Sequence, residues 1–252
     1  MKILAIIPAR LNSSRLPEKL LKDINGKSVI ERVYKQVIQC PELNEVIIAV
    51  DDQIVFDHVE RFGGKAIMTG LHHESGTDRC AEVALHLDDF THVINIQGDE
   101  PFINPKDISS LAHLLNDPNI QIATLISSIV DLEDLTNPNV VKVIKDRYGK
   151  ALYFSRAAIP FKRDIGTNNE SVLNAVFRHI GIYGFQRNVL IEVSKLKPGS
   201  LEQIEKLEQL RWLENAYSIY TAIIEKRSGF NSGIDTIEDL KRARLYAELN
   251  AL

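Results

Sequence analysis

The residues best suited to chemistry lie near the start of the chain, where the apolar run Ile3–Ile7 ends at Pro8. The residues that follow are cationic or hydroxylated: Arg10, Ser13, Ser14, Arg15 and Lys19. In open α/β sheets, ligands bind at the carboxyl ends of strands, and Arg and Lys side chains offset phosphate charge. The loop has neither the P-loop nor the dinucleotide glycine pattern. We therefore expect it to bind a polyphosphate through side chains rather than through a glycine-rich nest.

A pair of acids, Asp99 and Glu100, follows a second predicted buried strand at 92–97. Carboxylate oxygens suit Mg²⁺, which keeps waters and substrate phosphates as its other ligands. An acid at the end of a strand near the basic loop is well placed to hold this metal against a phosphate. The alternative is that Gly98 and Asp99 form only a turn, because this residue pair is common in turns.

Asp235 is the candidate for a second metal-binding carboxylate. It also lies at the start of a predicted helix, where Asp235 with Glu238, or Thr236 with Asp239, fits an N-cap and an acid in the first turn. The two roles are compatible if one carboxylate oxygen caps the helix and the other binds metal.

The segment 72–79 reads as a turn that leads into a helix capped by Ser75 or Thr77. Gly76 would let a flat base approach the backbone closely. His72 and His73 suggest a metal, but no third ligand follows at zinc-like spacing. The segment therefore contacts a nucleobase edge or is a simple helix cap.

A last group of polar side chains lies beside apolar elements. Glu205, Glu208 and Gln209 would share one face of a helix predicted over 203–216. Taken singly, His179 is typical of a satisfied structural histidine and Glu208 of a surface acid. The group also includes Arg156, Arg178 and Tyr183. Together these residues suggest a pocket for an acidic, polyhydroxylated molecule.

The elements that must position these residues alternate along the chain. Strands are expected at 3–7, 45–50, 66–68, 92–97, 122–129, 178–185 and 219–224. Helices are expected at 29–39, 54–62, 77–87, 105–115, 189–196, 203–216 and 237–249, and a hairpin at 140–144 and 151–154. The pattern predicts one Rossmann-like α/β domain over 1–252, with a mostly parallel sheet flanked by helices. Residues 160–176 break the rhythm, and we expect them to form a small excursion at a subunit contact.

Composition excludes several classes of protein. The chain has 252 residues and a formal net charge of −4, which argues against a dedicated nucleic-acid binder. Its apolar runs are too short to span a bilayer, and its beginning lacks the pattern of a signal peptide. Cys40 and Cys80 have no metal-like spacing, so we expect reduced thiols in a cytoplasmic protein.

Eight segments, in order along nearly the whole chain, resemble the cytidylyltransferases that activate acidic sugars, and among them the 3-deoxy-manno-octulosonate (Kdo) cytidylyltransferases. They are IPARLNSSRLPEK at 7–19, HESGTDR at 73–79, QGDEP at 97–101, NPNVVKV at 137–143, YFSR at 153–156, HIGIY at 179–183, LEQLR at 207–211 and GIDT at 233–236. The chain departs from the family at Ala157-Ala158, where Ser-Pro is frequent, and at Phe161, where Trp is common.

The resemblance implies a fold of the nucleotide-diphospho-sugar transferase type and the reaction of CTP with Kdo to give CMP-Kdo and diphosphate. This reaction supplies lipopolysaccharide biosynthesis, requires Mg²⁺ and is catalysed by a cytoplasmic homodimer. By motif position, CTP would be bound by Pro8, Ala9, Arg10, Ser13, Lys19, Ser75, Gly76 and Arg79, with Arg10 and Lys19 on the phosphates. Asp99 and Asp235 would bind Mg²⁺, and these two acids with Arg10 and Lys19 would form the catalytic set. The sugar would be bound by Gln97, Arg156, His179, Tyr183, Glu208 and Gln209.

Two rival hypotheses remain at this point. The first is a cytidylyltransferase for a related acid, such as 8-amino-Kdo or a sialic acid. The second is a non-catalytic regulator that binds a nucleotide on the same fold. The joint presence of Arg10, Lys19, Asp99 and Asp235 favours an enzyme, since a regulator could lose the metal-binding acids and still bind a nucleotide.

Overall fold

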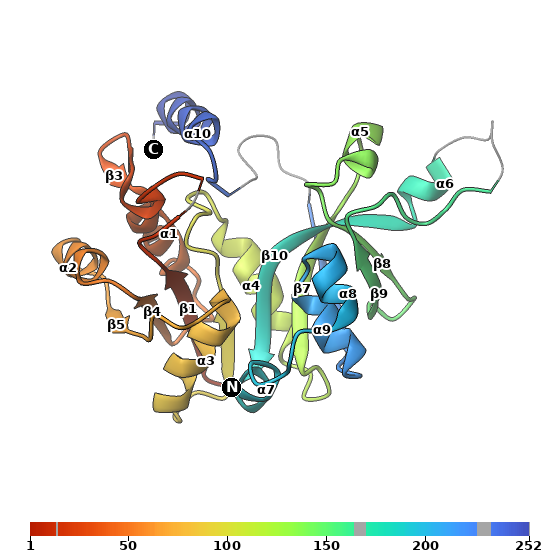
Figure 1. The fold of residues 1–252 in the computed structure, drawn as a ribbon, viewed down its shortest axis with the longest axis horizontal. Helices are drawn as coiled ribbons and strands as arrows, with labels where there is room; N and C mark the ends of the chain where they lie inside the picture. The colour runs from red at the N-terminus through yellow and green to blue at the C-terminus, as the bar shows by residue number, and fades with distance from the viewer. Residues whose placement is uncertain (14, 164–169, 226–232, 252) are drawn as a thin grey trace.

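The fold is built on one twisted sheet whose strands run in the order β11-β7-β10-β6-β1-β4-β5 (Figure 1). This computed structural model describes residues 1–13, 15–163, 170–225 and 233–251. The strands of the sheet are β1 (Ile3–Ala9), β4 (Glu45–Val50), β5 (Ala66–Met68), β6 (His92–Asn95), β7 (Ile122–Ser128), β8 (Lys142–Lys145), β9 (Ala151–Ser155), β10 (Val176–Gln186) and β11 (Ile219–Ile224). A separate small ribbon consists of β2 (Asp23–Ile24) and β3 (Lys27–Ser28).

Most neighbouring strands of the central row are parallel, as the sequence predicts. β1 pairs in parallel with β4 and β6, β4 with β5, and β7 with β11. The exception is β10, which runs antiparallel between β6 and β7 and extends beyond β6 to pair with β8. β8 and β9 form the predicted hairpin. The antiparallel strand therefore separates the parallel strands β6, β1, β4 and β5 from a second unit that contains β7, β8, β9 and β11.

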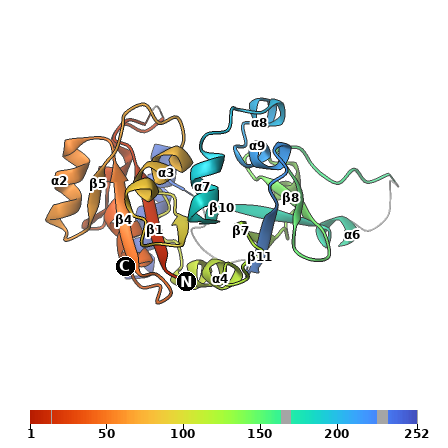
Figure 2. The same cartoon turned by 90° about the horizontal axis from the view of Figure 1, so that it is seen from below.

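Helices cover both faces of the sheet (Figure 2). Their bounds are η1 (Lys19–Leu21), α1 (Val29–Val37), α2 (Gln53–Arg61), α3 (Gly76–His86), α4 (Pro105–Leu114), α5 (Leu132–Thr136), α6 (Glu170–Leu173), α7 (Arg187–Val193), α8 (Ser200–Glu205), α9 (Gln209–Glu214) and α10 (Ile237–Leu249). In the part of the chain that the structure describes, no helix combines the length and the apolar character needed to cross a membrane.

The core has two layers because the side chains of β1 alternate between the two faces of the sheet. Ile3, Ala5 and Ile7 pack with the buried faces of α1, α4 and α10. Leu4 and Ile6 pack with α3, α7 and α9 on the opposite face. A strand covered on both faces reads as a continuous apolar run, which is why the sequence identified it.

The single helix predicted over 203–216 is wrong. Lys206 has a φ of 53°, in the left-handed region, and its amide N–H bonds to the carbonyl of Glu202, so α8 ends there. α9 begins after a three-residue connection. Glu205 consequently does not share a helix face with Glu208 and Gln209. Apolar spacing continues across the break, and no proline or glycine marks it in the sequence.

Candidate active site

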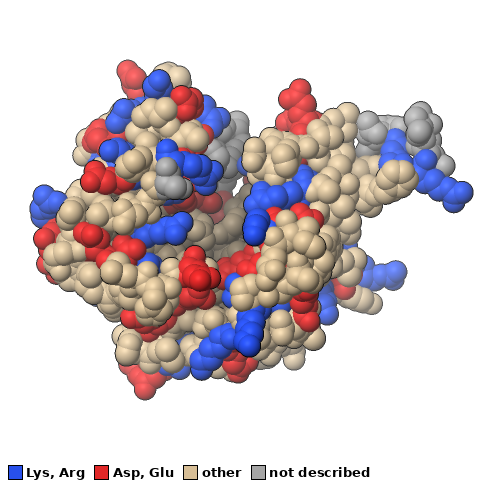
Figure 3. Space-filling view, viewed as in Figure 1, with Lys and Arg blue, Asp and Glu red and all other residues tan. Residues whose placement is uncertain are grey.

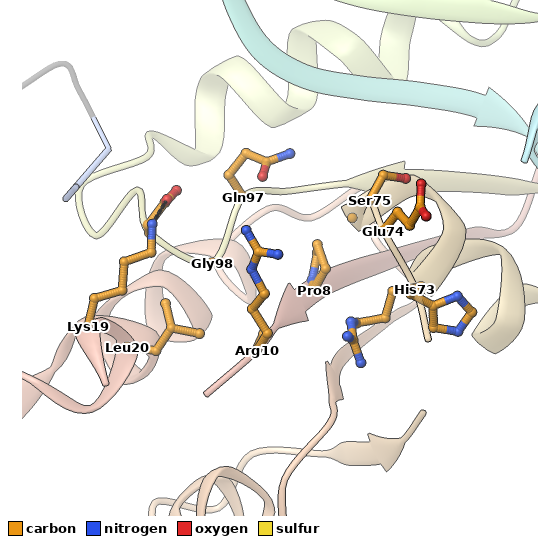
Figure 4. Close-up of a pocket in the computed structure, with 13 residues that line it drawn as sticks. Pro8, Arg10, Lys19, Leu20, His73, Glu74, Ser75, Gln97 and Gly98 are labelled. Atoms are coloured by element: carbon orange, nitrogen blue, oxygen red, sulfur yellow. Dashed lines mark hydrogen bonds and ion pairs between the residues drawn. The ribbon is translucent and has the colours of Figure 1, made fainter. Parts of the chain in front are cut away.

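A small pocket lies at the carboxyl ends of β1 and β6, as the sequence predicts for the basic loop. Figure 4 shows the Arg10 and Gln97 side chains extending into the same space, between Lys19 on one side and Ser75 on the other. The lining consists of Pro8, Ala9, Arg10, Lys19, Leu20, His73, Glu74, Ser75, Gly76, Arg79, Gln97, Gly98 and Asp99. Gly98 is required by packing, because a Cβ there would lie 2.8 Å from the Pro8 carbonyl oxygen. The pocket combines cations and backbone with the carboxylates of Glu74 and Asp99, and its cations suit a nucleoside polyphosphate.

The loop before α3 is held by polar contacts on both sides of the pocket. Ser75 Oγ accepts a hydrogen bond from the Asp78 amide, and the Asp78 carboxylate accepts one from the Ser75 amide. This capping box confirms Ser75, one of the two predicted caps, as the N-cap of α3. Arg79 is buried and its guanidinium lies 3.1 Å from a carboxylate oxygen of Asp51. Arg79 therefore fixes the pocket wall through neighbouring side chains.

His73 lines the same pocket and forms a hydrogen bond with Glu82. Burial alone would favour the neutral form of the Glu82 carboxyl. Hydrogen bonds from His73 and from the Gly70 amide more than offset this effect and lower the pKa of Glu82. The charged carboxylate thus orients the His73 ring beside the nucleotide pocket.

Two carboxylates from distant parts of the chain meet at Lys19. The Lys19 Nζ lies 2.5 Å from Asp99 Oδ2 and 3.1 Å from Asp235 Oδ1. A backbone bond of 2.9 Å from the Ile234 amide to the Asp99 carbonyl holds the two segments together. Arg15 Nη2 lies 3.0 Å from the other oxygen of Asp235. The structure therefore brings together the two acids that the sequence selected.

The N-cap of α10 is Thr236 and not its neighbour Asp235. Thr236 accepts from the Asp239 amide, and Asp239 accepts from the Thr236 amide, so this pair forms the capping box of α10. The Asp235 carboxylate takes no part in the cap and pairs with Lys19 and Arg15 instead. Among the described residues, no cluster of three or more His, Cys, Asp or Glu side chains has a metal-binding arrangement. Two converging carboxylates nevertheless fit Mg²⁺, since this ion binds through one or two carboxylates plus substrate phosphates.

A much larger cavity of about 1190 Å³ opens beside the first pocket, where the surface is hollowed (Figure 3). Its wall includes Arg156, Arg178 and His179, and Asp235 lies at its edge with the small pocket. β10 has an irregularity in its pairing with β7 between Ile180 and Tyr183. Bulges of this kind re-aim side chains next to active sites. The cavity is large enough for an eight-carbon sugar acid.

His179 and Glu100 have strongly shifted pKa values in this cavity. Burial lowers the pKa of His179 to about 3, so the ring is neutral, and its Nε2 lies 2.9 Å from Thr124 Oγ1. Burial, with a further contribution from Asp99, raises the pKa of Glu100 to about 7, while the positive charge of Arg178 acts in the opposite direction. Shifts of this size are typical of functional sites.

Tyr183, Glu208 and Gln209 lie behind the two pockets and line neither. Glu208 accepts a 2.7 Å hydrogen bond from Thr77 in α3, and burial raises its pKa. Three buried polar atoms of this cluster have no hydrogen-bond partner among the described residues. They are the Tyr183 hydroxyl, Glu208 Oε1 and Gln209 Nε2. Buried polar groups normally have hydrogen-bond partners. This cluster is therefore suited to bind water or a hydroxylated ligand that reaches it.

The structure divides the remaining predicted residues as follows. Gln97, which the resemblance assigns to the sugar, lies in the small pocket beside Gly98. Ser13 lines neither pocket. The sequence interpretation included Arg178 in the polar group but did not name it as a site residue, although it directly precedes His179. The sequence signal for Arg178 is a charged residue at the end of an apolar strand, and such residues are also common on protein surfaces.

Comparisons with known proteins agree with this geometry. Residues 4–224 match the cytidylyltransferase family. A 3-deoxy-manno-octulosonate cytidylyltransferase of Cytophaga hutchinsonii is 48% identical over 96% of each chain. The corresponding protein of Phocaeicola vulgatus is 44% identical over 98% of this chain and 97% of its own. A solved structure of CMP:2-keto-3-deoxy-manno-octonic acid synthetase complexed with CTP has 40% identity and a TM-score of 0.90, with full coverage of both chains.

The fold and the paired pockets thus define a nucleotidyltransferase of the cytidylyltransferase class. Within that class, the chain belongs to the family of 3-deoxy-manno-octulosonate cytidylyltransferases.

Proposed function

We propose that this protein transfers CMP from CTP to 3-deoxy-D-manno-octulosonate, giving CMP-Kdo and diphosphate, and so activates the sugar for lipopolysaccharide biosynthesis. One observation carries the proposal. Asp99 lines the small pocket, Asp235 lines the large cavity, and Lys19 Nζ bonds to both acids. The two pockets therefore meet at the paired carboxylates, which is where a nucleotide phosphate and a sugar hydroxyl must meet to react.

The chemistry follows from positioning and charge. The anomeric hydroxyl of the sugar attacks the α-phosphorus in line and loses its proton, and the bond to the departing diphosphate breaks. Arg10 and Lys19 offset the negative charge that gathers on the diphosphate. Such transfer needs no covalent enzyme intermediate, because orientation and electrostatics supply most of the rate.

We propose that Asp99 and Asp235 hold Mg²⁺ when the substrates are bound. The ion would supply Lewis acidity and would orient the sugar oxygens against the phosphate. Lys19 lies between the two carboxylates, and their negative charges balance its positive charge. The donor set supports a hard cation and contains no sulfur or imidazole.

Diphosphate release tests the function directly. The assay crosses CTP, UTP, ATP and GTP with Kdo, 8-amino-Kdo and N-acetylneuraminate in the presence of Mg²⁺. Release only with CTP and Kdo is expected. The 8-amino sugar is included because the acids Glu100 and Asp107 also line the large cavity. Release with a different sugar would reassign the substrate, and no release with any pair would favour the nucleotide-binding regulator.

We also propose a cytoplasmic homodimer with its contact in 160–176. Residues 164–169 lie outside the described residues. Phe161 is 89% exposed, and α6 stands away from the main body (Figure 1). Cys40 and Cys80 are free thiols, which agrees with a reducing compartment. Deletion within 160–176 should give a monomer by light scattering, and a persistent dimer would contradict this contact.

A further inference from the structure

Lys142 is a fully buried cation directly behind the wall of the large cavity. It is the first residue of β8, and its side chain has no exposed surface. It lies in the NPNVVKV segment, which carries part of the family resemblance but supplies none of the site residues predicted from it. Burial of an ammonium group is costly unless the protein satisfies its charge and its hydrogens.

All three ammonium hydrogens have acceptors. Lys142 Nζ donates to the carbonyl oxygens of Asn137 at 2.8 Å, Val140 at 2.6 Å and Arg156 at 2.5 Å. An ammonium group has three donors, so this set uses its full capacity. In the described part of the chain, no carboxylate lies within ion-pair distance of Lys142 Nζ. Burial and, to a smaller extent, the positive charge of Arg156 lower the pKa of this amine, and Glu205 and Asp134 oppose that effect only from longer range.

The three carbonyls come from two segments that line the cavity. Asn137 and Val140 belong to the loop between α5 and β8, and Arg156 directly follows β9. The ammonium group joins these segments from behind, because Lys142 itself does not line the cavity. A change at Lys142 would therefore alter the shape of the wall without removing any atom that faces the ligand.

Arg156 is fixed by further bonds once its carbonyl is held. Its Nε donates to the Glu205 carbonyl at 2.8 Å, and its Nη1 donates to the Pro138 carbonyl at 3.0 Å. The Glu205 carboxylate accepts from the Arg156 amide at 2.9 Å and from Ser155 Oγ at 2.6 Å. The guanidinium thus spans from α8 to the loop that Lys142 anchors.

We infer that Lys142 is a positioning residue for the sugar acid: it holds Arg156 and the loop 137–140 in the arrangement that binds the sugar, and its charge beneath the wall favours an anionic ligand. This inference rests on the proposed function and concerns only its sugar half. CTP occupies the other pocket, whose lining includes none of the residues that Lys142 contacts.

The test compares Lys142→Met with Lys145→Met in the full-length protein. Lys145 ends the same strand, and its ammonium lies over the Phe177 ring at 5.4 Å, away from the three carbonyls. Lys142→Met should raise the KM for Kdo at least about tenfold, as expected for loss of a charged hydrogen-bond donor, and change the KM for CTP less than about twofold. Lys145→Met should leave both values near those of the wild type.

A second comparison separates positioning from general loss of structure. If Lys142 acts through Arg156, the Met substitution should raise the KM for Kdo less than about twofold in an Arg156→Gln background. If Lys142→Met does not fold, Lys142→Gln, which keeps two donor hydrogens, serves in its place and should change the KM for Kdo in the same direction.

Three outcomes would overturn the inference: an unchanged KM for Kdo in a folded variant, equal increases in the KM for both substrates, or failure of both variants to fold with CTP present. The last would make Lys142 a residue of the core alone. A wild-type protein that releases no diphosphate from CTP and Kdo would instead contradict the proposed function, so the two failures are distinguishable.

Discussion

At the scale of single residues, replacement of Asp99 should affect turnover much more than stability. Its carboxylate touches Lys19 and is partly exposed, so replacement by Asn should cost at most about 1 kcal/mol of unfolding free energy. The same change removes a charge from the point where the two pockets meet. We expect Asp99→Asn to lower kcat by on the order of 100-fold or more.

Turnover at saturating Mg²⁺, with urea unfolding in parallel, measures both effects. Asp88→Asn, an exposed acid after α3, is the control and should behave like the wild type. Near-normal turnover of Asp99→Asn would remove Asp99 from the metal site.

His179 gives a pH prediction with a definite sign. Burial lowers its pKa to about 3 in the folded protein, against an ordinary value of 6.5. Between these values the unfolded chain binds the additional proton, so stability must fall as the pH drops below 6.5. From pH 6.5 to 5 the loss that His179 causes should be about 1–2 kcal/mol.

Urea unfolding across this pH range should show a smaller loss for His179→Gln than for the wild type. His86→Gln, at an exposed position in α3, should keep the loss of the wild type. Identical pH dependence of the wild type and His179→Gln would show that His179 does not cause the acid sensitivity.

At the scale of elements, the end of α9 carries backbone strain that one substitution can relieve. Ala216 has a φ of 65°, and its amide bonds to the Leu213 carbonyl. The Tyr217 amide bonds to the Trp212 carbonyl, which completes a Schellman motif with Ala216 at the left-handed position. Ala216 is exposed, so Ala216→Gly should raise the unfolding free energy by about 1 kcal/mol.

Thermal and urea unfolding of Ala216→Gly test this prediction, with Ala157→Gly as a comparison outside the left-handed region. A destabilised Ala216→Gly would mean that the entropy of the unfolded chain outweighs the strain at this helix end.

Local sequence patterns predicted an element well where the residues of that element alone determine its structure. β1 is apolar throughout, and the caps at Ser75 and Thr236 use short-range bonds, so each was visible in the sequence. The break at Lys206 was not visible, because a left-handed lysine leaves no compositional mark. The three bonds of Lys142 were equally hidden, since two of its acceptors are backbone atoms of a loop and the third follows a different strand.

At the scale of the whole molecule, the site depends on how the two units meet. The parallel strands and α3 build the small pocket, whereas β7, β10 and the loop between α5 and β8 build much of the wall of the large cavity. The sequence motifs gave both sets of residues, but they could not place Gln97 in the first pocket or Glu208 behind both. Those positions depend on contacts between segments far apart in the sequence, such as the hydrogen bond between Thr77 and Glu208.

The Thr77–Glu208 hydrogen bond therefore gives the prediction that belongs to this scale. Thr77 is 2% exposed, Glu208 precedes α9 with a buried Oε1 atom, and Thr77 Oγ1 lies 2.7 Å from Glu208 Oε2. Thr77→Val keeps the shape but leaves a buried carboxylate without its donor, which should cost about 1–3 kcal/mol of unfolding free energy. It should also raise the pKa of Glu208 further, because that hydrogen bond opposes the effect of burial.

Thr77→Ser retains the hydroxyl and should stay within about 1 kcal/mol of the wild type, which makes it the matched control. Urea unfolding measures the stability of both variants, and diphosphate release measures their turnover. Because Thr77 adjoins Gly76 of the small pocket, the Val variant should also turn over more slowly when both substrates are saturating. Equal stability and turnover of the Val and Ser variants would show that this bond does not couple the two units.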